Sequence, residues 1–126
     1  KTVPAKVLLE KLDPQTLKFV LFFSSVAARF GNVGQSDYSA ANEILNKTAT
    51  RMSALWPDAH CLSVNWGPWN AGMVSQTLSE LYAGKGIHLI PPGVGLRLGI
   101  LELLEIRDTE VLIAADTKKI SQWGLG

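Results

Sequence analysis

Three short apolar runs, each separated from the next by a stretch long enough for a helix, constrain the fold of this chain more than any other feature. The runs are KFVLFF (residues 18–23), HCLSVNW (60–66) and EVLIAA (110–115). Short runs rich in β-branched and aromatic residues are typical of strands. Strands that alternate with helices form a parallel sheet, and the helical connections are then right-handed. The sequence therefore predicts an α/β fold with about three parallel strands and right-handed connections.

Helix signals fill the segments around these runs. Four helices are expected, over residues 1–12, about 36–55, 75–82 and about 94–104. Ser36 or Asp37 is expected to cap the second helix through its side chain. The last helix carries an apolar face that should be covered. The first strand is apolar throughout, so we expect it to be buried on both faces.

A sheet of three strands is thin, and its first strand is as apolar as a strand in the middle of a sheet. Nothing before residue 18 can pair with its outer edge, and an uncovered apolar edge favours association. We therefore expect only the C-terminal half of a Rossmann-type, doubly wound parallel sheet. The chain is expected to associate with the missing half or with a second copy of itself.

Charge and cysteine content exclude several classes of partner. The 12 basic and 11 acidic side chains give a net charge of +1, without the basic surface that attracts nucleic acid or an anionic membrane. No apolar run approaches the roughly 20 residues of a membrane span. A single cysteine, Cys61, cannot form an internal disulfide and fits a reducing cytoplasm. His60 and His88 have no partner at metal-ligand spacing, so no metal site is expected.

Polar side chains gather at the predicted carboxyl end of the sheet, which is the edge where ligands bind in open parallel sheets. Ser24 and Ser25 follow the first apolar run, and Tyr38 and Asn42 lie one turn apart at the start of the long helix. A serine that holds a carbonyl oxygen, beside a tyrosine that donates a proton, suits the reduction of a ketone to an alcohol. The reference pKa of tyrosine is about 10, so a nearby ammonium is needed to favour proton release at neutral pH. The first predicted helix offers two candidates, Lys1 and Lys6.

Two stretches resemble a known family. They are FVLFFSSVAARFGNVGQSDYSAANEILN (residues 19–46) and SVNWGPWNAGM (63–73), and both look like the ketoreductase domain of modular polyketide synthases and multidomain polyunsaturated-fatty-acid synthases, in the short-chain dehydrogenase/reductase superfamily. The resemblance is specific, because the Ser…Tyr-x-x-x-Asn spacing and the Trp-Gly-Pro-Trp loop occur together and in order. It implies NADPH as the cofactor, a β-ketoacyl group on an acyl carrier protein as the substrate, and the other domains of a synthase as partners.

The resemblance also implies roles for individual residues. By position, Ser25, Tyr38 and Asn42 match catalytic residues of the family. The family's lysine lies on the preceding helix, and spacing back from Ser25 puts it at Lys1, with Lys6 as the second candidate. The residues that would lie along the nicotinamide are Gly67, Pro68, Trp69 and Met73.

Parts of the family pattern are missing from the chain. The glycine-rich turn that grips the cofactor's phosphates is absent, so residues 1–126 are expected to be the C-terminal part of a single ketoreductase domain without its phosphate-binding half, inactive alone. The helix at residues 75–84 would be the mobile lid of that domain. Phe30 and Gln35 do not match the residues that indicate stereochemical class, so the configuration of the alcohol stays open.

Two other functions remain possible from the sequence. One is a non-catalytic, reductase-like half that braces a partner domain in a large synthase. The other is a binding module that holds an acyl carrier protein through the lid face. The combination of Ser25, Tyr38 and Asn42 favours catalysis by the intact domain.

Overall fold

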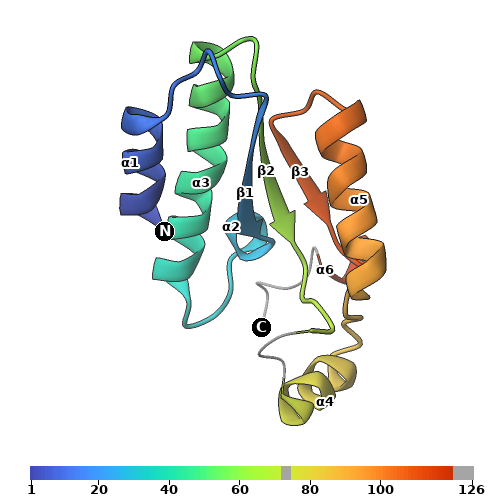
Figure 1. Cartoon of the computed structure of the whole chain (residues 1–126). Helices are drawn as coiled ribbons and strands as arrows, with labels where there is room; N and C mark the ends of the chain where they lie inside the picture. The colour runs from blue at the N-terminus through green and yellow to red at the C-terminus, as the bar shows by residue number, and fades with distance from the viewer. Residues whose placement is uncertain (72–74, 121–126) are drawn as a thin grey trace.

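The computed structural model describes residues 1–71 and 75–120 as a parallel sheet between helices (Figure 1). The strands are β1 (Phe19–Ser25), β2 (His60–Trp66) and β3 (Glu110–Ile113). The helices are α1 (Thr2–Lys11), α2 (Ala27–Phe30), α3 (Ser36–Leu55), α4 (Gln76–Gly84), α5 (Pro92–Glu105) and α6 (Thr117–Ile120). Both strand pairs are parallel and the order is β1-β2-β3. The predicted fold class is confirmed.

The two faces of the sheet are covered by different helices. Figure 1 shows α1 and α3 on one side of the sheet and α5 on the other. Because the three strands follow in one direction while α3 and α5 lie on opposite faces, the two connections must have opposite hands. The prediction that both are right-handed is therefore wrong. Two right-handed connections would put both helices on one face and leave the other apolar face of β2 bare within this chain.

The face under α3 contains the first apolar core. Leu45, Ala49 and Met52 recur at helical spacing and are at most 6% exposed, packed against Phe22 and Cys61 of the strands. The core continues into α1 through one buried residue, Ala5, and partly buried leucines. This packing fixes α3 along the sheet, with its first turns at the carboxyl ends of the strands.

The opposite face is packed through glycines of α5. A Cβ atom added at Gly95 would lie 2.6 Å from the ring of Trp69, and one added at Gly99 would lie 3.0 Å from the ring of Trp66. The two indoles thus rest directly on the helix backbone. Most of the apolar side chains of α5 are exposed instead, among them Leu96 at 61%. The apolar face predicted for this helix is therefore only partly covered in the described structure.

Several local predictions were wrong. Strand β1 continues through Ser25 instead of ending at Phe23, and one of its faces is open, since Phe23 is 57% exposed and Phe19 53% exposed. Helix α3 has Gln35 at its N-cap position without a side-chain hydrogen bond, so neither Ser36 nor Asp37 caps it. The short helices α2 and α6 were not predicted, because four residues carry too little periodicity. Strand β3 stops at Ile113, two residues early.

Candidate functional site

Lys1, Tyr38 and Asn42 meet at the carboxyl end of β1. The Lys1 ammonium donates to Asn42 Oδ1 at 2.6 Å and to the carbonyl oxygen of Phe23 at 3.2 Å. It also lies 5.2 Å from the centroid of the Tyr38 ring. Asn42 is fully buried, and its Nδ2 donates back to the Tyr38 carbonyl at 2.8 Å. One cation therefore connects α1, the end of β1 and the first turns of α3.

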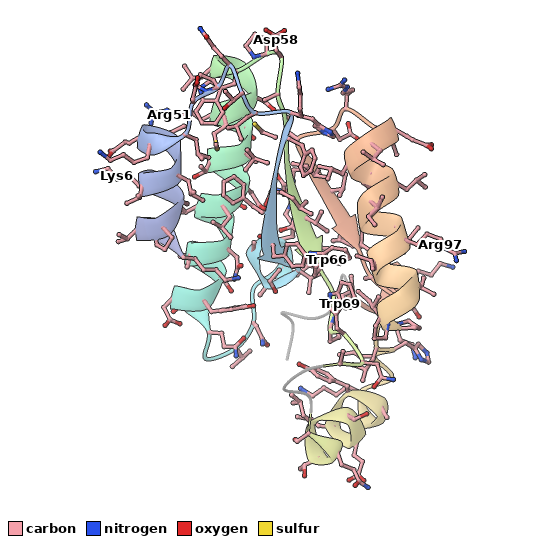
Figure 2. All side chains as sticks on the ribbon, viewed as in Figure 1. Lys6, Arg51, Asp58, Trp66, Trp69 and Arg97 are labelled. Carbon is pink, nitrogen blue, oxygen red and sulfur yellow. The ribbon has the colours of Figure 1, made fainter. Side chains whose placement is uncertain are left out.

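Of the two candidate lysines, only Lys1 reaches this cluster. Lys6 is exposed on α1, and its side chain points away from the sheet in Figure 2. Tyr38 is 42% exposed, so its ring is open to a molecule bound at this end of the sheet.

Ser25 lies at the carboxyl end of the sheet, as expected, and its side chain contacts the backbone at the start of α2. Its Oγ accepts a hydrogen bond from the backbone N–H of Ala27 at 3.2 Å, which ties the strand end to the start of α2. That bond uses an oxygen lone pair and leaves the hydroxyl proton able to donate. Among the described residues no hydrogen bond joins Ser25 to Tyr38 or Asn42. The structure thus brings three of the four predicted catalytic residues into contact, with Ser25 nearby on the same edge.

A buried polar layer lies between α3 and the sheet, and three of its members, Asn46, Ser63 and Asn65, were not predicted. Its members are 0–5% exposed: Ser24, Asn42, Asn46, Ser63 and Asn65. Ser24 Oγ lies 3.1 Å from the Asn42 carbonyl oxygen and 3.0 Å from Asn65 Oδ1. The sequence did carry a signal, because Ser63 and Asn65 alternate with apolar residues in β2 and Asn46 follows Asn42 by one helical turn.

The polar layer ends in charged groups. Asn65 Nδ2 donates to Glu110 Oε1 at 2.8 Å, and Arg29 Nε lies 2.7 Å from the same oxygen. On α3, burial alone would raise the pKa of Glu43, but hydrogen bonds from Asn46 and Lys47 and nearby positive charge bring that pKa below its ordinary value.

The loop after β2 is held by its own backbone and by α5. Gly67 donates to the Ile113 carbonyl at 2.8 Å, and a Cβ atom there would lie 3.1 Å from that of Ala114. The Pro68 carbonyl accepts from Ile90 N–H at 2.7 Å. Trp69 packs edge-on against Trp66, the last residue of β2, with ring centroids 4.7 Å apart. The predicted loop residues thus form a fixed wall at the carboxyl end of β2, except Met73, which lies outside the described residues.

Helix α4 lies beyond the carboxyl ends of the strands, apart from the sheet (Figure 1). Ser75 caps it by accepting from Leu78 N–H at 3.2 Å, and the helix has no buried residue. Burial raises the pKa of Tyr82 on this helix, and the negative charge of an ionised Tyr38 raises it further.

An apolar groove lies on the other face of the sheet, between β1 and α5. Figure 2 shows Trp66 and Trp69 at this position, near the strand ends. The groove is lined by Leu21, Phe23, Trp66, Trp69, Leu96, Gly99, Ile100 and Leu103. The indole nitrogen of Trp66 is buried and has no hydrogen-bond partner among the described residues.

His60 and Cys61 both lie in structural surroundings on β2. The ring nitrogens of His60 lie 2.7 and 2.9 Å from the carbonyl oxygens of Leu103 and Asp108, where they join β2 to the end of α5. Cys61 is fully buried, and burial raises the pKa of its thiol. Within residues 1–71 and 75–120, no cluster of three or more histidine, cysteine or acidic side chains is placed to hold a metal ion. No helix in the same ranges is long and apolar enough to cross a membrane.

Comparison with known proteins identifies the family that carries this arrangement. The family model of the KR (ketoreductase) domain matches residues 1–71, which include α1, β1, α3 and β2. The chain belongs to the ketoreductase domain family. Ketoreductase domains of this type use nicotinamide cofactors.

Among curated relatives, the ketoreductase chain is 37% identical over 116 residues to a polyunsaturated fatty acid synthase from a Thraustochytrium species. It is 38% identical over 115 residues to the polyketide synthase GfsA of Streptomyces halstedii. Each match covers 90% of this chain but only 4% and 2% of the relatives, which are large multidomain synthases.

Solved ketoreductases share the fold. One is PlmKR1, the ketoreductase from the first module of phoslactomycin biosynthesis in Streptomyces sp. HK803, with a TM-score of 0.83 and 26% identity over 95% of this chain. Another is the first ketoreductase of the tylosin polyketide synthase, with a TM-score of 0.72 and 29% identity over 87% of this chain. The ketoreductase chain spans 27% and 24% of these two structures, about a quarter of each.

Proposed function

We propose that residues 1–126 are the C-terminal part of one ketoreductase domain, which reduces a β-ketoacyl group on an acyl carrier protein to the β-hydroxyacyl group in a cytoplasmic synthase. The observation that carries this proposal is the contact of the Lys1 ammonium with Asn42 Oδ1 at 2.6 Å, beside the Tyr38 ring. A cation, a buried amide and a phenol at the ligand-binding edge of a parallel sheet are suited to moving a proton onto a carbonyl oxygen.

In this mechanism Tyr38 is the general acid. Its hydroxyl gives a proton to the oxygen of the substrate carbonyl as that oxygen becomes an alcohol. The Lys1 ammonium stabilises the negative charge that develops on the phenol oxygen, because opposite charges attract strongly where water is partly excluded. Asn42 holds the ammonium in place and fixes the first turn of α3 through the Tyr38 carbonyl.

Ser25 is proposed to hold the substrate oxygen. Its Oγ already accepts from Ala27 N–H, so its proton is available for a second partner. A hydroxyl donor fixed in this way stabilises the growing charge without reorganising during the reaction.

The cofactor proposed for the domain is NADPH, which supplies the hydride to the substrate carbon. The described residues fit only the nicotinamide end of such a molecule, because Pro68 and Trp69 form a fixed wall at the carboxyl end of β2. No glycine-rich phosphate turn is present in the sequence. We therefore propose that the rest of the domain supplies the phosphate grip and covers the apolar groove beside β1.

Replacement of Tyr38 by phenylalanine in the full-length protein tests this function. Tyr38→Phe keeps the ring but removes the proton, so the rate of NADPH-dependent reduction of a β-ketoacyl thioester should fall by about 10²–10⁴-fold. Thr48→Ala is a matched control, because it removes a hydroxyl of the same helix that donates to the Ile44 carbonyl of that helix. NADPH absorbance measures the rate, and thermal melting checks the fold.

Near-normal turnover by Tyr38→Phe would contradict the enzymatic proposal. A wild-type protein that binds NADPH without reducing the thioester would contradict it as well. Either result would favour a non-catalytic reductase-like part that braces its neighbours in the synthase.

A further inference from the structure

The buried polar layer under α3 joins a helix to a sheet at a cost in folding free energy. Its five side chains are at most 5% exposed, and a buried polar group destabilises the fold unless it is hydrogen-bonded. Apolar side chains of the same shape could join the two elements without this requirement. Hydrogen bonds differ from apolar contacts in having a preferred distance and direction. The layer therefore fixes the position of α3 on the sheet more closely than apolar contacts would.

Asn65 is the centre of the layer. Its Oδ1 accepts from Ser24 Oγ of β1 and from Asn46 Nδ2 of α3, both at 3.0 Å. Its Nδ2 donates to Glu110 Oε1 of β3 at 2.8 Å. The amide has one orientation that suits all three neighbours, since two are donors and the third is a carboxylate. A single side chain on β2 therefore joins three other elements.

Asn65 is connected to chain segments on both sides of Ser25, directly to Ser24 and through Glu110 to Arg29. Ser24 precedes Ser25 and contacts Asn65 directly. Arg29 lies on α2, whose start is tied to Ser25, and its Nε lies 2.7 Å from the Glu110 oxygen that Asn65 also contacts. The strand end and the following helix are thus both anchored to the same amide.

The same centre is connected to the other half of the site. Ser24 Oγ also lies 3.1 Å from the carbonyl oxygen of Asn42, the residue that contacts both Lys1 and the Tyr38 carbonyl. The single hydroxyl proton of Ser24 is shared between Asn42 on α3 and Asn65 on β2. This contact sets the spacing between β1, which carries Ser25, and the first turns of α3, which carry Tyr38.

We propose that Asn65 is a positioning residue that holds Ser25 at the correct distance from Tyr38. This proposal rests on the proposed reductase function, because it assigns no role without a reaction at these two hydroxyls. Asn65 touches neither of them. Its effect is carried by Ser24 on one side and by Glu110 with Arg29 on the other. Small displacements of reacting groups lower the rate strongly, by up to about 100-fold for 1 Å.

Two serines in the layer form a matched pair for testing the proposal in the full-length protein. Ser24→Ala removes the hydroxyl that joins Asn65 to Asn42. Ser63→Ala removes an equally buried hydroxyl that reaches Asn65 only through Asn46, at 2.8 Å from Asn46 Oδ1. We expect kcat for β-keto thioester reduction to fall about 10-fold in Ser24→Ala with KM unchanged. In Ser63→Ala, kcat should stay within about twofold of wild type, with a similar shift in melting temperature.

A swap of amide and carboxylate tests Asn65 itself. Asn65→Asp puts a carboxylate against Glu110 and should lower kcat by about 10- to 100-fold. The double variant Asn65→Asp/Glu110→Gln restores one amide and one carboxylate at the same two positions and should recover most of kcat.

The outcomes separate this proposal from the function on which it rests. If wild type is active and the two serine variants have equal kcat values, or if the double variant is no better than Asn65→Asp, the positioning role is overturned and the reductase function stands. If wild type does not reduce the thioester, the proposed function fails and the positioning role fails with it.

Discussion

The two ends of the interface between α3 and the sheet are formed by different types of side chain, apolar at one end and polar at the other. Toward the C-terminus of α3, Ala49 and Met52 pack on the apolar residues of β1 and β2. Toward its N-terminus, Asn42 and Asn46 hydrogen-bond to serine and asparagine side chains of the same strands. Apolar burial stabilises without direction, whereas hydrogen bonds fix position. The comparison indicates that one end of α3 supplies stability and the other sets the geometry of the candidate site.

The largest effect on stability is expected at the apolar end. Met52 is fully buried between α3 and the sheet, so Met52→Ala in the full-length protein should lower the free energy of unfolding of this domain by about 2–5 kcal/mol. The turnover number of the remaining folded protein should change by less than about twofold, because the apolar end does not hold the residues of the candidate site. Denaturant unfolding and NADPH absorbance measure the two quantities. A large fall in kcat in folded protein would contradict the division between the two ends.

A smaller effect, with the opposite sign, is expected from a serine that lies outside the polar layer. Ser39 Oγ is buried without a hydrogen-bond partner among the described residues. Ser39→Ala should raise the free energy of unfolding by about 0.5–1 kcal/mol, because it removes an unpaired group and alanine favours helices.

Ser53 on the same helix provides the control for this change. Its Oγ donates to the Cys61 carbonyl at 3.3 Å, so Ser53→Ala should lower the free energy of unfolding instead, by about 0.5–1.5 kcal/mol. Denaturant unfolding measures the free energy of unfolding of both variants. If the two variants change the free energy of unfolding with the same sign, the presence of a hydrogen-bond partner does not decide how these serines affect stability.

The smallest effect concerns acid sensitivity at the polar end. The pKa of Glu43 is lowered in the folded protein, so its contribution to stability is complete above the pKa of an unfolded glutamate, about 4.3, and is lost as the pH falls through the lower folded value. Glu43→Gln should therefore flatten the loss of stability between neutral pH and about pH 3. Unfolding measured across that range tests this. Glu10→Gln, which removes an exposed carboxylate on α1, controls for net charge. Identical pH curves for wild type and Glu43→Gln would contradict the expectation.

The sequence predicted the sheet and most helices because periodicity and turn residues are local signals. The strand at residues 60–66 was predicted with the bounds that the structure has, and all seven of its residues are buried. Predictions that depended on distant partners were less successful. The hand of one connection, the open face of β1 and the missing side-chain cap of α3 each depend on what lies next to the element in space.

The site shows the same division. Ser25, Tyr38 and Asn42 could be chosen from the sequence, because hydroxyl and amide side chains at a strand end and a helix start must lie at one edge of a parallel sheet. The contacts among them could not. Lys1 is 41 positions from Asn42 in sequence, and a local pattern contains no information about a 2.6 Å contact over that separation. Asn65 was not predicted as a site residue. A polar residue in a buried strand indicates that it has a hydrogen-bond partner but does not indicate which residue the partner is.

By itself, the sequence determined the order of strands and helices, the family, and the residue types that can perform carbonyl reduction. These follow from side-chain chemistry and from periodicities of two and 3.6 residues, which act over a few positions along the chain. Only the tertiary structure decided that Lys1 is the lysine that reaches Tyr38 and that α5 packs on the sheet through its glycines. It also decided that Asn65 contacts both Ser24 and Glu110. Those outcomes depend on distances between segments far apart in the chain. The packing of the whole sheet sets these distances, and no single segment specifies them.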